Sequence, residues 1–378
     1  MSPTDSQAPS APLVVAIDPR QQRPQRVAVL PGDGIGKDVT VEAVKVLEAA
    51  AERWSLPLEL VQFPYDADYF LATGIPMPPG QMEEFRDRFA AIFIGAYGDP
   101  RIPDMRHAAD ILLGIRFQLD LFINFRPCKL YDARLCPLKG KSESDVDFVV
   151  FRENTEGGYV GIGGNFKKGT PDEVAIQEEV HTYKGVERIC RAAFEWARAH
   201  GRGKVLMSDK SNVMRFGHDL WQRVFFDVAR EYPGIAASHM FVDALCMQLI
   251  KAPEQFEVIV ANNMLGDILT DLGAALQGGL GVAGSANLHP GRVSMFEPVH
   301  GSAPKYAGTG RANPLGAILS TALLLDELGH REVANEVERA AATAIREGRV
   351  TKDLGGSLTT SEVGDSIARE IAAATLAR

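Results

Sequence analysis

Val27-Ala-Val-Leu-Pro-Gly-Asp-Gly-Ile-Gly36 is the stretch that decides the fold class. Its four apolar residues predict a short buried strand, the glycine-rich turn ends that strand, and the next segment predicts a helix of about 17 residues ending near Trp54. Further strand-like runs follow at residues 58–62, 91–96, 147–152, 204–208, 237–242 and 257–261, most of them separated by helix-length amphipathic segments. Because this alternation is typical of one architecture, we predict an α/β fold.

The composition indicates a folded protein with a small partner. The chain has 378 residues, 46% hydrophobic and 24% charged, which is enough for two domains with a full core. A net charge of -9 argues against nucleic acid and anionic membrane surfaces as partners. No run approaches the roughly 18 apolar residues that a membrane span needs. Four cysteines without CxxC spacing predict reduced thiols in a cytoplasmic protein, and residues 1–25 predict a flexible tail.

Two carboxylates, Asp267 and Asp271, lie four residues apart in an otherwise uncharged stretch, residues 262–277. On a helix they share one face, where like charges repel unless a cation lies between them. Carboxylates without neighbouring Cys or His favour a hard ion, Mg²⁺ or Mn²⁺. The spacing alone also fits two surface acids paired with lysines. Asp243, which follows a strand-like run, is either a helix N-cap or a third metal ligand.

Three arginines, Arg116, Arg126 and Arg152, are candidates for binding an anionic substrate. Arg152 follows the apolar run 148–151, where a buried strand meets a loop. Guanidinium groups at such places suit bidentate recognition of carboxylates. Each arginine alone is explained as well by a structural salt bridge, so the functional interpretation depends on their occurrence together with the acidic pair.

Two further residues can move protons. Tyr159 follows two glycines in a loop, and Lys210 comes just after a buried strand. A partly desolvated lysine beside a metal acts as a base, and a tyrosine can donate a proton. The alternatives are aromatic packing for Tyr159 and a surface pair with Asp209 or another acid for Lys210.

The remaining segments concern assembly and the glycine-rich turn. Residues 32–36 read G-x-G-x-G rather than G-x-G-x-x-G, so a tight structural turn is at least as good an interpretation as a dinucleotide site. Between Gly157 and Val180 an antiparallel hairpin or arm is predicted, of the kind that pairs with a second subunit. Helices are predicted at 315–328, at 331–347 and from Ser361.

Four motifs together resemble those of the β-decarboxylating dehydrogenases, a family that includes isopropylmalate, isocitrate, homoisocitrate and tartrate/D-malate enzymes. They are Pro31-Gly-Asp-Gly-Ile-Gly36, Arg152-Glu-Asn-Thr-Glu-Gly157, Asn263-Met-Leu-Gly-Asp-Ile-Leu-Thr-Asp271 and Glu297-Pro-Val-His-Gly-Ser-Ala-Pro304. The resemblance implies an isopropylmalate-dehydrogenase-like two-domain fold with a mixed central sheet flanked by helices, distinct from the Rossmann fold. It also implies a large cofactor-binding domain, residues 26–121 plus 278–378. A small domain, residues 122–277, would contain the dimerisation arm and the metal site.

The activity that the resemblance implies is metal-dependent oxidative decarboxylation of a (2R)-3-substituted malate, with hydride transfer to NAD(P)⁺. The substrate would be held by Arg116, Arg126 and Arg152, and Mg²⁺ or Mn²⁺ by Asp243, Asp267 and Asp271. Lys210 would receive the hydroxyl proton and Tyr159 would protonate C3. Lys210 and Asp243 would come from the other subunit, so a homodimer would share its active sites.

The resemblance also implies a cofactor site, with Asn212 near the nicotinamide. The implied residues are Asn212, Glu297, His300, Gly301, Ser302, Ala303, Lys305, Tyr306 and Asn313. NAD-dependent members usually carry Asp where this chain has Lys305, whereas Lys305-Tyr306 is similar to the NADP-dependent isocitrate enzymes. Because a cation attracts the 2′-phosphate, NADP is favoured over NAD.

Substrate choice depends on the residues before Arg116. Leu112 and Leu113 occupy positions that in isopropylmalate enzymes pack the isopropyl group, and an apolar wall would leave a third substrate carboxylate unpaired, which disfavours isocitrate. Gly114 is expected to enlarge the pocket. Isopropylmalate is therefore favoured. One alternative is a tartrate/D-malate enzyme, because members of that branch also carry two leucines here. Another is an isocitrate or homoisocitrate enzyme. A non-catalytic regulatory subunit is disfavoured, because the implied catalytic residues are all present.

Overall fold

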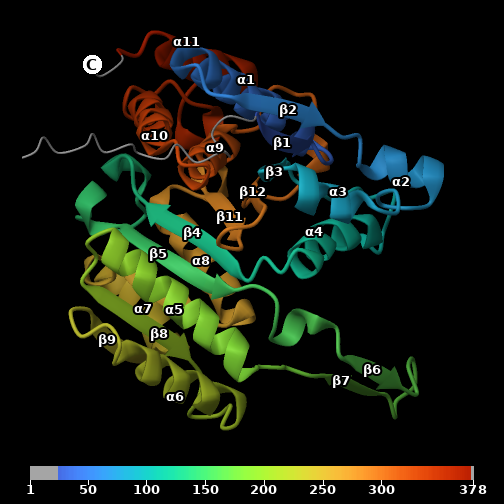
Figure 1. The fold of residues 1–378 in the computed structure, drawn as a ribbon, viewed down its shortest axis with the longest axis vertical. Coiled ribbons are helices and arrows are strands. Elements are labelled where there is room, and N and C mark those ends of the chain that lie inside the picture. Colours follow the sequence, from blue (N-terminus) through green and yellow to red (C-terminus); the bar gives the residue numbers. More distant parts are fainter. Residues whose placement is uncertain (1–23, 376–378) are drawn as a thin grey trace, which may run out of the picture.

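The computed structural model describes residues 24–375, in which helices cover both faces of a ten-stranded mixed sheet (Figure 1). The strands of this sheet are β1 (Gln25–Leu30), β2 (Leu58–Gln62), β3 (Ala91–Ile94), β4 (Ile123–Lys129), β5 (Asp147–Glu153), β8 (Lys204–Asp209), β9 (Ala236–Phe241), β10 (Val258–Ala261), β11 (Gly284–Leu288) and β12 (Ser294–Pro298). The α-helices are α1 (Ile35–Trp54), α2 (Ala67–Thr73), α3 (Gln81–Arg88), α4 (Arg106–Gln118), α5 (Tyr183–Ala199), α6 (Gly217–Ala229), α7 (Val242–Lys251), α8 (Asn263–Gln277), α9 (Leu315–Glu327), α10 (Arg331–Arg346) and α11 (Thr360–Ala372). None of these helices is long and apolar enough to cross a membrane.

The sheet has an antiparallel centre between two parallel flanks. Its strand order is β2-β1-β3-β12-β11-β4-β5-β10-β8-β9. The pairs β12-β11, β11-β4 and β4-β5 are antiparallel, and the other six pairs are parallel. The predicted α/β fold with a mixed central sheet is therefore confirmed.

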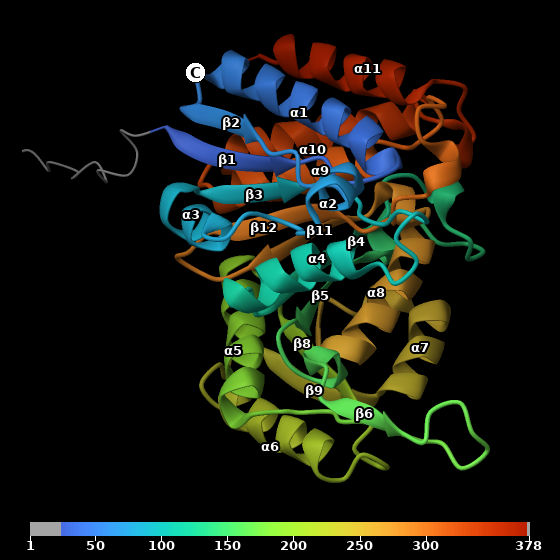
Figure 2. The same ribbon diagram turned by 90° about the vertical axis from the view of Figure 1, so that its right-hand side faces the viewer.

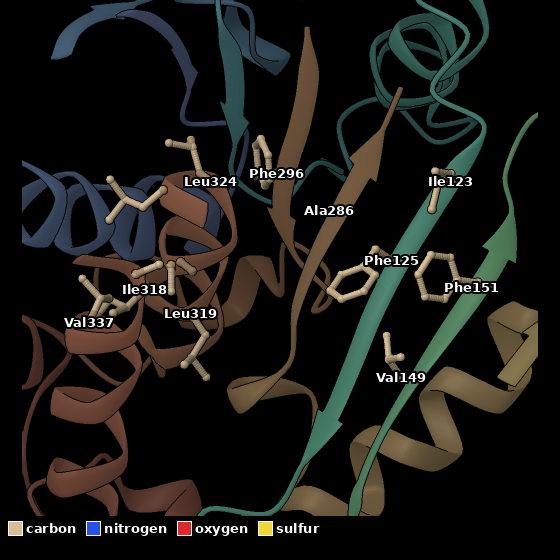
Figure 3. Close-up of a cluster of buried hydrophobic side chains, with 14 of the residues drawn as sticks. Ile123, Phe125, Val149, Phe151, Ala286, Phe296, Ile318, Leu319, Leu324 and Val337 are labelled. Carbon is tan, nitrogen blue, oxygen red and sulfur yellow. The ribbon is translucent and has the colours of Figure 1, made fainter. Parts of the chain in front are cut away.

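One large hydrophobic core joins segments that are far apart in the chain. Figure 3 shows Phe125 and Phe151 of β4 and β5 on one side of it and Leu319 and Leu324 of α9 on the other. α1 contributes the buried residues Val39, Ala43, Val46, Leu47 and Ala50, which recur at helical spacing. The predicted division into residues 26–121 plus 278–378 and residues 122–277 stays a prediction, since both the sheet and this core run through the two parts.

The glycine-rich turn is a closed structural turn. The N–H of Asp33 donates to the carbonyl of Ala96 at 2.7 Å, and the N–H of Ile35 donates to the carbonyl of Ser302 at 2.8 Å. A Cβ on Gly34 would lie 2.2 Å from that Ser302 oxygen, so only glycine allows this approach. Because Ser302 already occupies an N–H at the start of α1, the turn does not present the free helix terminus that a pyrophosphate site uses.

A two-stranded arm, β6 (Gly163–Phe166) and β7 (Val174–Gln177), extends from the body of the molecule (Figure 2). It confirms the hairpin predicted between Gly157 and Val180. Its apolar side chains face solvent, with Phe166 65% and Ile176 56% exposed. An isolated strand pair of this size is only marginally stable in water.

The sequence prediction missed the three central strands β4, β11 and β12. Their apolar pattern is interrupted by polar side chains and prolines, for example Asn124 and Pro127 in β4. Asn124 is nevertheless buried, because its amide donates to Asn287 Oδ1 at 2.9 Å in β11. Of the predicted tail, residues 1–23 lie outside the described residues, and Gln25 already belongs to β1.

Candidate active site

Helix α8 brings the two predicted metal ligands close to the sheet. Asn262 caps it by accepting the N–H of Leu265 at 2.8 Å. Gly266 faces β5, where a Cβ would lie 2.7 Å from the side chain of Arg152. Gly273 faces β4, where a Cβ would lie 2.4 Å from Cys128 Sγ. These two glycines let the helix approach the strands closely, so that Asp267 comes beside Arg152.

Arg126, Arg152, Tyr159 and Asp267 form one cluster on this side of the sheet, with Asp271 at its edge. Arg152 donates Nε and Nη2 to Asn263 Oδ1 at 3.0 and 2.7 Å, and Nη1 to Asp267 Oδ1. The Tyr159 hydroxyl donates to Asp267 Oδ2 at 3.0 Å. Arg126 lies 3.9 Å from both Asp267 and Asp271. The acids therefore pair with arginines of the site, not with surface lysines.

The buried arginines lie close enough together to disfavour one another's positive charge. Burial lowers the pKa of Arg152 to about 10, and the neighbouring charge of Arg126 acts in the same direction. Burial also lowers the pKa of Arg126, against the influence of Glu297. Moreover, the Nε atoms of Arg116 and Arg126 are buried and lack a hydrogen-bond partner among the described residues. Buried donors without acceptors at concentrated positive charge suit an anionic ligand.

Glu297, which was predicted to bind cofactor, is the buried partner of Arg116. Its Oε1 accepts from Arg116 Nη2 and from Asn287 Nδ2, both at 2.8 Å. Burial alone would raise the pKa of Glu297, but Arg116 and these hydrogen bonds outweigh it and lower the pKa. Asn287 in turn accepts from Asn154 at 3.0 Å. The sequence did not predict this network of asparagine amides. The pattern that could have indicated it is the presence of asparagines inside or beside apolar runs.

Lys210 and Asp243 lie apart from the cluster as a pair of their own. Lys210 Nζ is 2.8 Å from Asp243 Oδ1, and this hydrogen bond lowers the pKa of Asp243. Asp243 is the second residue of α7, whose N-cap is Phe241, so the N-cap interpretation of Asp243 is wrong. Within residues 24–375, the carboxylates of Asp243, Asp267 and Asp271 do not come together as a three-ligand group. One chain thus places two of the three predicted ligands together.

The two predicted substrate-wall leucines lie on α4, the helix that carries Arg116. Leu112 packs against the core beneath the helix, and Leu113 lines a surface hollow with Met77 and Phe117. A Cβ on Gly114 would lie 3.5 Å from Met82 of α3. Gly114 lines the same hollow as Leu113, next to α3, and its effect on the substrate pocket stays a prediction.

Several of the predicted cofactor residues share a cavity of about 380 Å³ beside the start of α1. It is lined by Ile35, Gly281, His300, Tyr306, Arg311, Ala312, Asn313, Lys352 and Asp353. His300 Nε2 is buried and has no partner among the described residues, so it is available to a ligand. Lys305 Nζ lies 4.7 Å from the centre of the Tyr306 ring. An aromatic ring, an unpaired imidazole nitrogen and nearby cations fit a nucleotide.

The other predicted cofactor residues are placed differently. Ser302 is buried, and its carbonyl accepts from α1, while Gly301 is exposed and Ala303 is partly exposed beside it. Asn212 is exposed in the turn that carries Lys210.

The two acids of α8, Asp267 and Asp271, offer hard oxygen donors suited to a divalent cation, and the Asp271 side chain is 62% exposed.

Comparison with known proteins agrees with this geometry. Residues 26–367 match the family described as isocitrate/isopropylmalate dehydrogenase. The chain is 42% identical to 3-isopropylmalate dehydrogenase of Thermobifida fusca, over 93% of this chain and 98% of that protein. It is also 42% identical to D-malate dehydrogenase [decarboxylating] of Escherichia coli, over 92% and 98%.

A solved structure shows the same fold. Isocitrate dehydrogenase from Methylococcus capsulatus superposes with a TM-score of 0.83 at 33% identity, covering 92% of this chain and 99% of that one. Members of this family use a divalent metal and NAD(P) and act on malate-type substrates. The chain belongs to the isocitrate/isopropylmalate dehydrogenase family and is an NAD(P)-dependent, β-decarboxylating dehydrogenase.

Proposed function

We propose that this enzyme oxidises and decarboxylates a (2R)-3-substituted malate, with 3-isopropylmalate as the favoured substrate. The observation that carries the proposal is a set of three neighbouring arginines, of which Arg126 and Arg152 lie beside Asp267 and Arg116 is paired with Glu297; Arg116 and Arg126 keep a buried Nε–H without an acceptor among the described residues. A malate core with two carboxylates would supply those acceptors. A tartrate/D-malate activity is the second candidate, favoured by the equal identity to the D-malate enzyme.

The residues divide the work by chemistry. Arg116, Arg126 and Arg152 would bind and orient the two carboxylates. Lys210 would receive the hydroxyl proton, and Tyr159, whose hydroxyl lies 3.0 Å from Asp267, would protonate C3. When bound by Asp243, Asp267 and Asp271, a divalent cation supplies positive charge near the substrate oxygen, and NAD(P)⁺ supplies the hydride acceptor.

A homodimer with shared sites is part of this proposal. The exposed faces of the neighbouring helices α7 and α8 are apolar beside the acids, with Met247 58% and Ile268 55% exposed. Phe216, after the Lys210 turn, is 94% exposed. Apolar surface next to incomplete catalytic groups is typical of a subunit interface. A second chain there would bring its Lys210 and Asp243 to the first chain's Asp267 and Asp271.

Leu112 and Leu113 support isopropylmalate over isocitrate. Both are apolar and lie within four residues of Arg116 on α4. A third carboxylate at this wall would lose water without gaining a partner.

The four cysteines support a cytoplasmic enzyme, because none of them forms a disulfide. They are Cys128, Cys136, Cys190 and Cys246.

The cations around Tyr306 support NADP over NAD. Lys305 and Arg311 both lie over its ring, at 4.7 and 5.6 Å, and Lys352 lines the same cavity. A Lys305→Asp variant should lower the preference for NADP⁺ over NAD⁺ by roughly 10- to 100-fold. Lys352→Met should do so less, since it leaves Lys305 in place. Strict use of NAD⁺ by the wild-type enzyme would contradict this part of the proposal.

One experiment tests the function as a whole. Reduction of NAD⁺ and NADP⁺ is measured with Mn²⁺ against 3-isopropylmalate, D-malate, tartrate, isocitrate and homoisocitrate. The highest kcat/KM is expected for 3-isopropylmalate. A strong preference for isocitrate would refute the argument from the two leucines, and no turnover with any of the five would favour a regulatory subunit.

A further inference from the structure

Three side chains outside the arginine cluster converge on one carboxylate oxygen. Glu179 Oε1 lies 3.1 Å from His181 Nε2 and 3.5 Å from His218 Nε2. The same oxygen accepts a hydrogen bond from Asn262 Nδ2 at 2.9 Å. Both imidazoles are almost fully buried, at 2% and 3% side-chain exposure. These contacts lower the pKa of Glu179 to about 2, with the His181 contact acting most strongly.

The hydrogen bonds of the two rings define their tautomers. His218 Nδ1 accepts the backbone N–H of Lys210 at 2.7 Å, and His181 Nδ1 accepts the indole N–H of Trp221 at 3.2 Å. In a neutral imidazole the other nitrogen then carries the proton. Both Nε2–H groups therefore lie on the side of their rings that is near Glu179 Oε1, and among the described residues the His181 Nε2–H makes no hydrogen bond of its own. Asn262 Nδ2 and His218 Nε2 lie 3.1 Å apart because both face the same acceptor, Glu179 Oε1.

This arrangement argues against a metal at the three residues. Glu179, His181 and His218 have their potential ligand atoms within 4.8 Å of one another. A metal would need an Nε2 lone pair from each ring. Those lone pairs are absent while Lys210 and Trp221 donate to the Nδ1 atoms, so the two rings present N–H groups to Glu179 and the three residues, with Asn262, form a polar network.

The network joins three parts of the candidate site. Through His218 it holds the backbone of Lys210. Through Asn262 it holds the cap of α8, which carries Asp267 and Asp271. Glu179 itself lies in the chain between strand β7 of the arm and Val180. Val180 forms a β-bridge with Gly157, and Gly157 precedes Tyr159 by two residues.

We propose that His218, oriented by Glu179, is a positioning residue that holds the Lys210 turn in its catalytic place. This inference rests on the proposed role of Lys210 in proton transfer. Because the N–H of Lys210 is the direct partner, loss of the acceptor would leave a partly buried donor unpaired and let the turn move. Lys210 would then keep its chemistry but lose its placement, which affects kcat more than KM.

Two variants of one residue separate positioning from general packing. In His218→Asn the amide oxygen can take the place of Nδ1 and still accept from Lys210. In His218→Gln the amide lies near the place of Nε2, so it can reach Glu179 but leaves the Lys210 N–H without its acceptor. We expect kcat to fall roughly 10- to 100-fold in His218→Gln, with a small change in substrate KM, and only a few-fold in His218→Asn. Glu179→Gln should lie between them.

Amide hydrogen exchange of the full-length protein provides a readout that does not need turnover. The Lys210 amide should exchange faster in His218→Gln than in the wild type and in His218→Asn, while residues 258–261 of β10 stay protected in all three. Equal Lys210 exchange in the two variants, or equal kcat, would overturn the inference. Zn²⁺ binding that requires both His181 and His218 would overturn it as well. A wild-type enzyme inactive on every malate would refute the proposed function, and the exchange data would still decide whether His218 holds Lys210.

Discussion

The cluster around Arg152 and the pair formed by Lys210 and Asp243 contain the same kinds of charge in opposite environments. Arg152 is 2% exposed and is held by Asn263 and Asp267 of its own chain. Lys210 and Asp243 are 31% and 63% exposed and have one ion pair between them. A buried charge needs its partners built in, whereas an exposed pair contributes at most about 1 kcal/mol. The buried cluster therefore depends on partners within its own fold, whereas Lys210 and Asp243 can change partners at little cost in free energy.

Removing a carboxylate from the cluster should have the largest effect. Asp271→Asn is expected to lower metal-dependent turnover on the order of a thousandfold, because the amide no longer offers a charged ligand to the cation. Initial rates at saturating Mn²⁺ measure it. Since Asp271 is largely exposed, the melting temperature should stay unchanged, and Glu48→Gln on the surface of α1 is the matched control. Full activity of Asp271→Asn would refute the metal site.

Subunit mixing tests whether the exposed pair serves a second chain. Lys210→Ala and Asp267→Asn chains, each inactive alone, are co-expressed or mixed after dissociation. If each site combines Lys210 of one chain with Asp267 of the other, half of the random dimers contain one intact site, which restores about a quarter of the wild-type activity. Activity that stays at the background of the single variants would place both residues in one chain's site.

Stability measurements should separate the two regions directly. Arg152→Met is expected to cost about 3 kcal/mol or more in the free energy of unfolding, because it leaves Asp267 and Asn263 without their buried partner. Lys210→Met should change it far less, because the ion pair of Lys210 with Asp243 is exposed and screened by solvent. Urea unfolding of both variants at neutral pH provides the comparison. Equal losses would contradict the distinction between the regions.

The smallest expected effect concerns the pH dependence of stability near Glu297. Its pKa is lowered from 4.5 in the folded state, so its contribution is present above pH 4.5 and is lost as the pH falls through the lowered pKa. Glu297→Gln should therefore flatten the acid limb of the stability profile. Denaturation midpoints from pH 3 to 7 test this prediction. An unchanged slope would mean that Glu297 titrates alike in both states.

The sequence predicted those elements in which local pattern and tertiary burial agree. β10 is a short apolar run, β2 alternates apolar and polar residues over Leu58–Leu60, and α8 carries both acids behind a capping Asn262, so these elements could be recognised locally. β4 and β11 could not be recognised locally. They contain Asn124 and Asn287, whose burial is favourable only because the two amides form a hydrogen bond across the sheet.

The sequence by itself determined the fold class, the family and the identity of the chemical groups. Those depend on local hydrophobic pattern and on motifs read along the chain. Only the tertiary structure decided which groups meet: Arg152 with Asp267, Arg116 with Glu297, and His218 with the backbone of Lys210. The physical reason is that hydrogen bonds act over about 3 Å in space, whereas Arg116 and Glu297 are 181 positions apart in the chain.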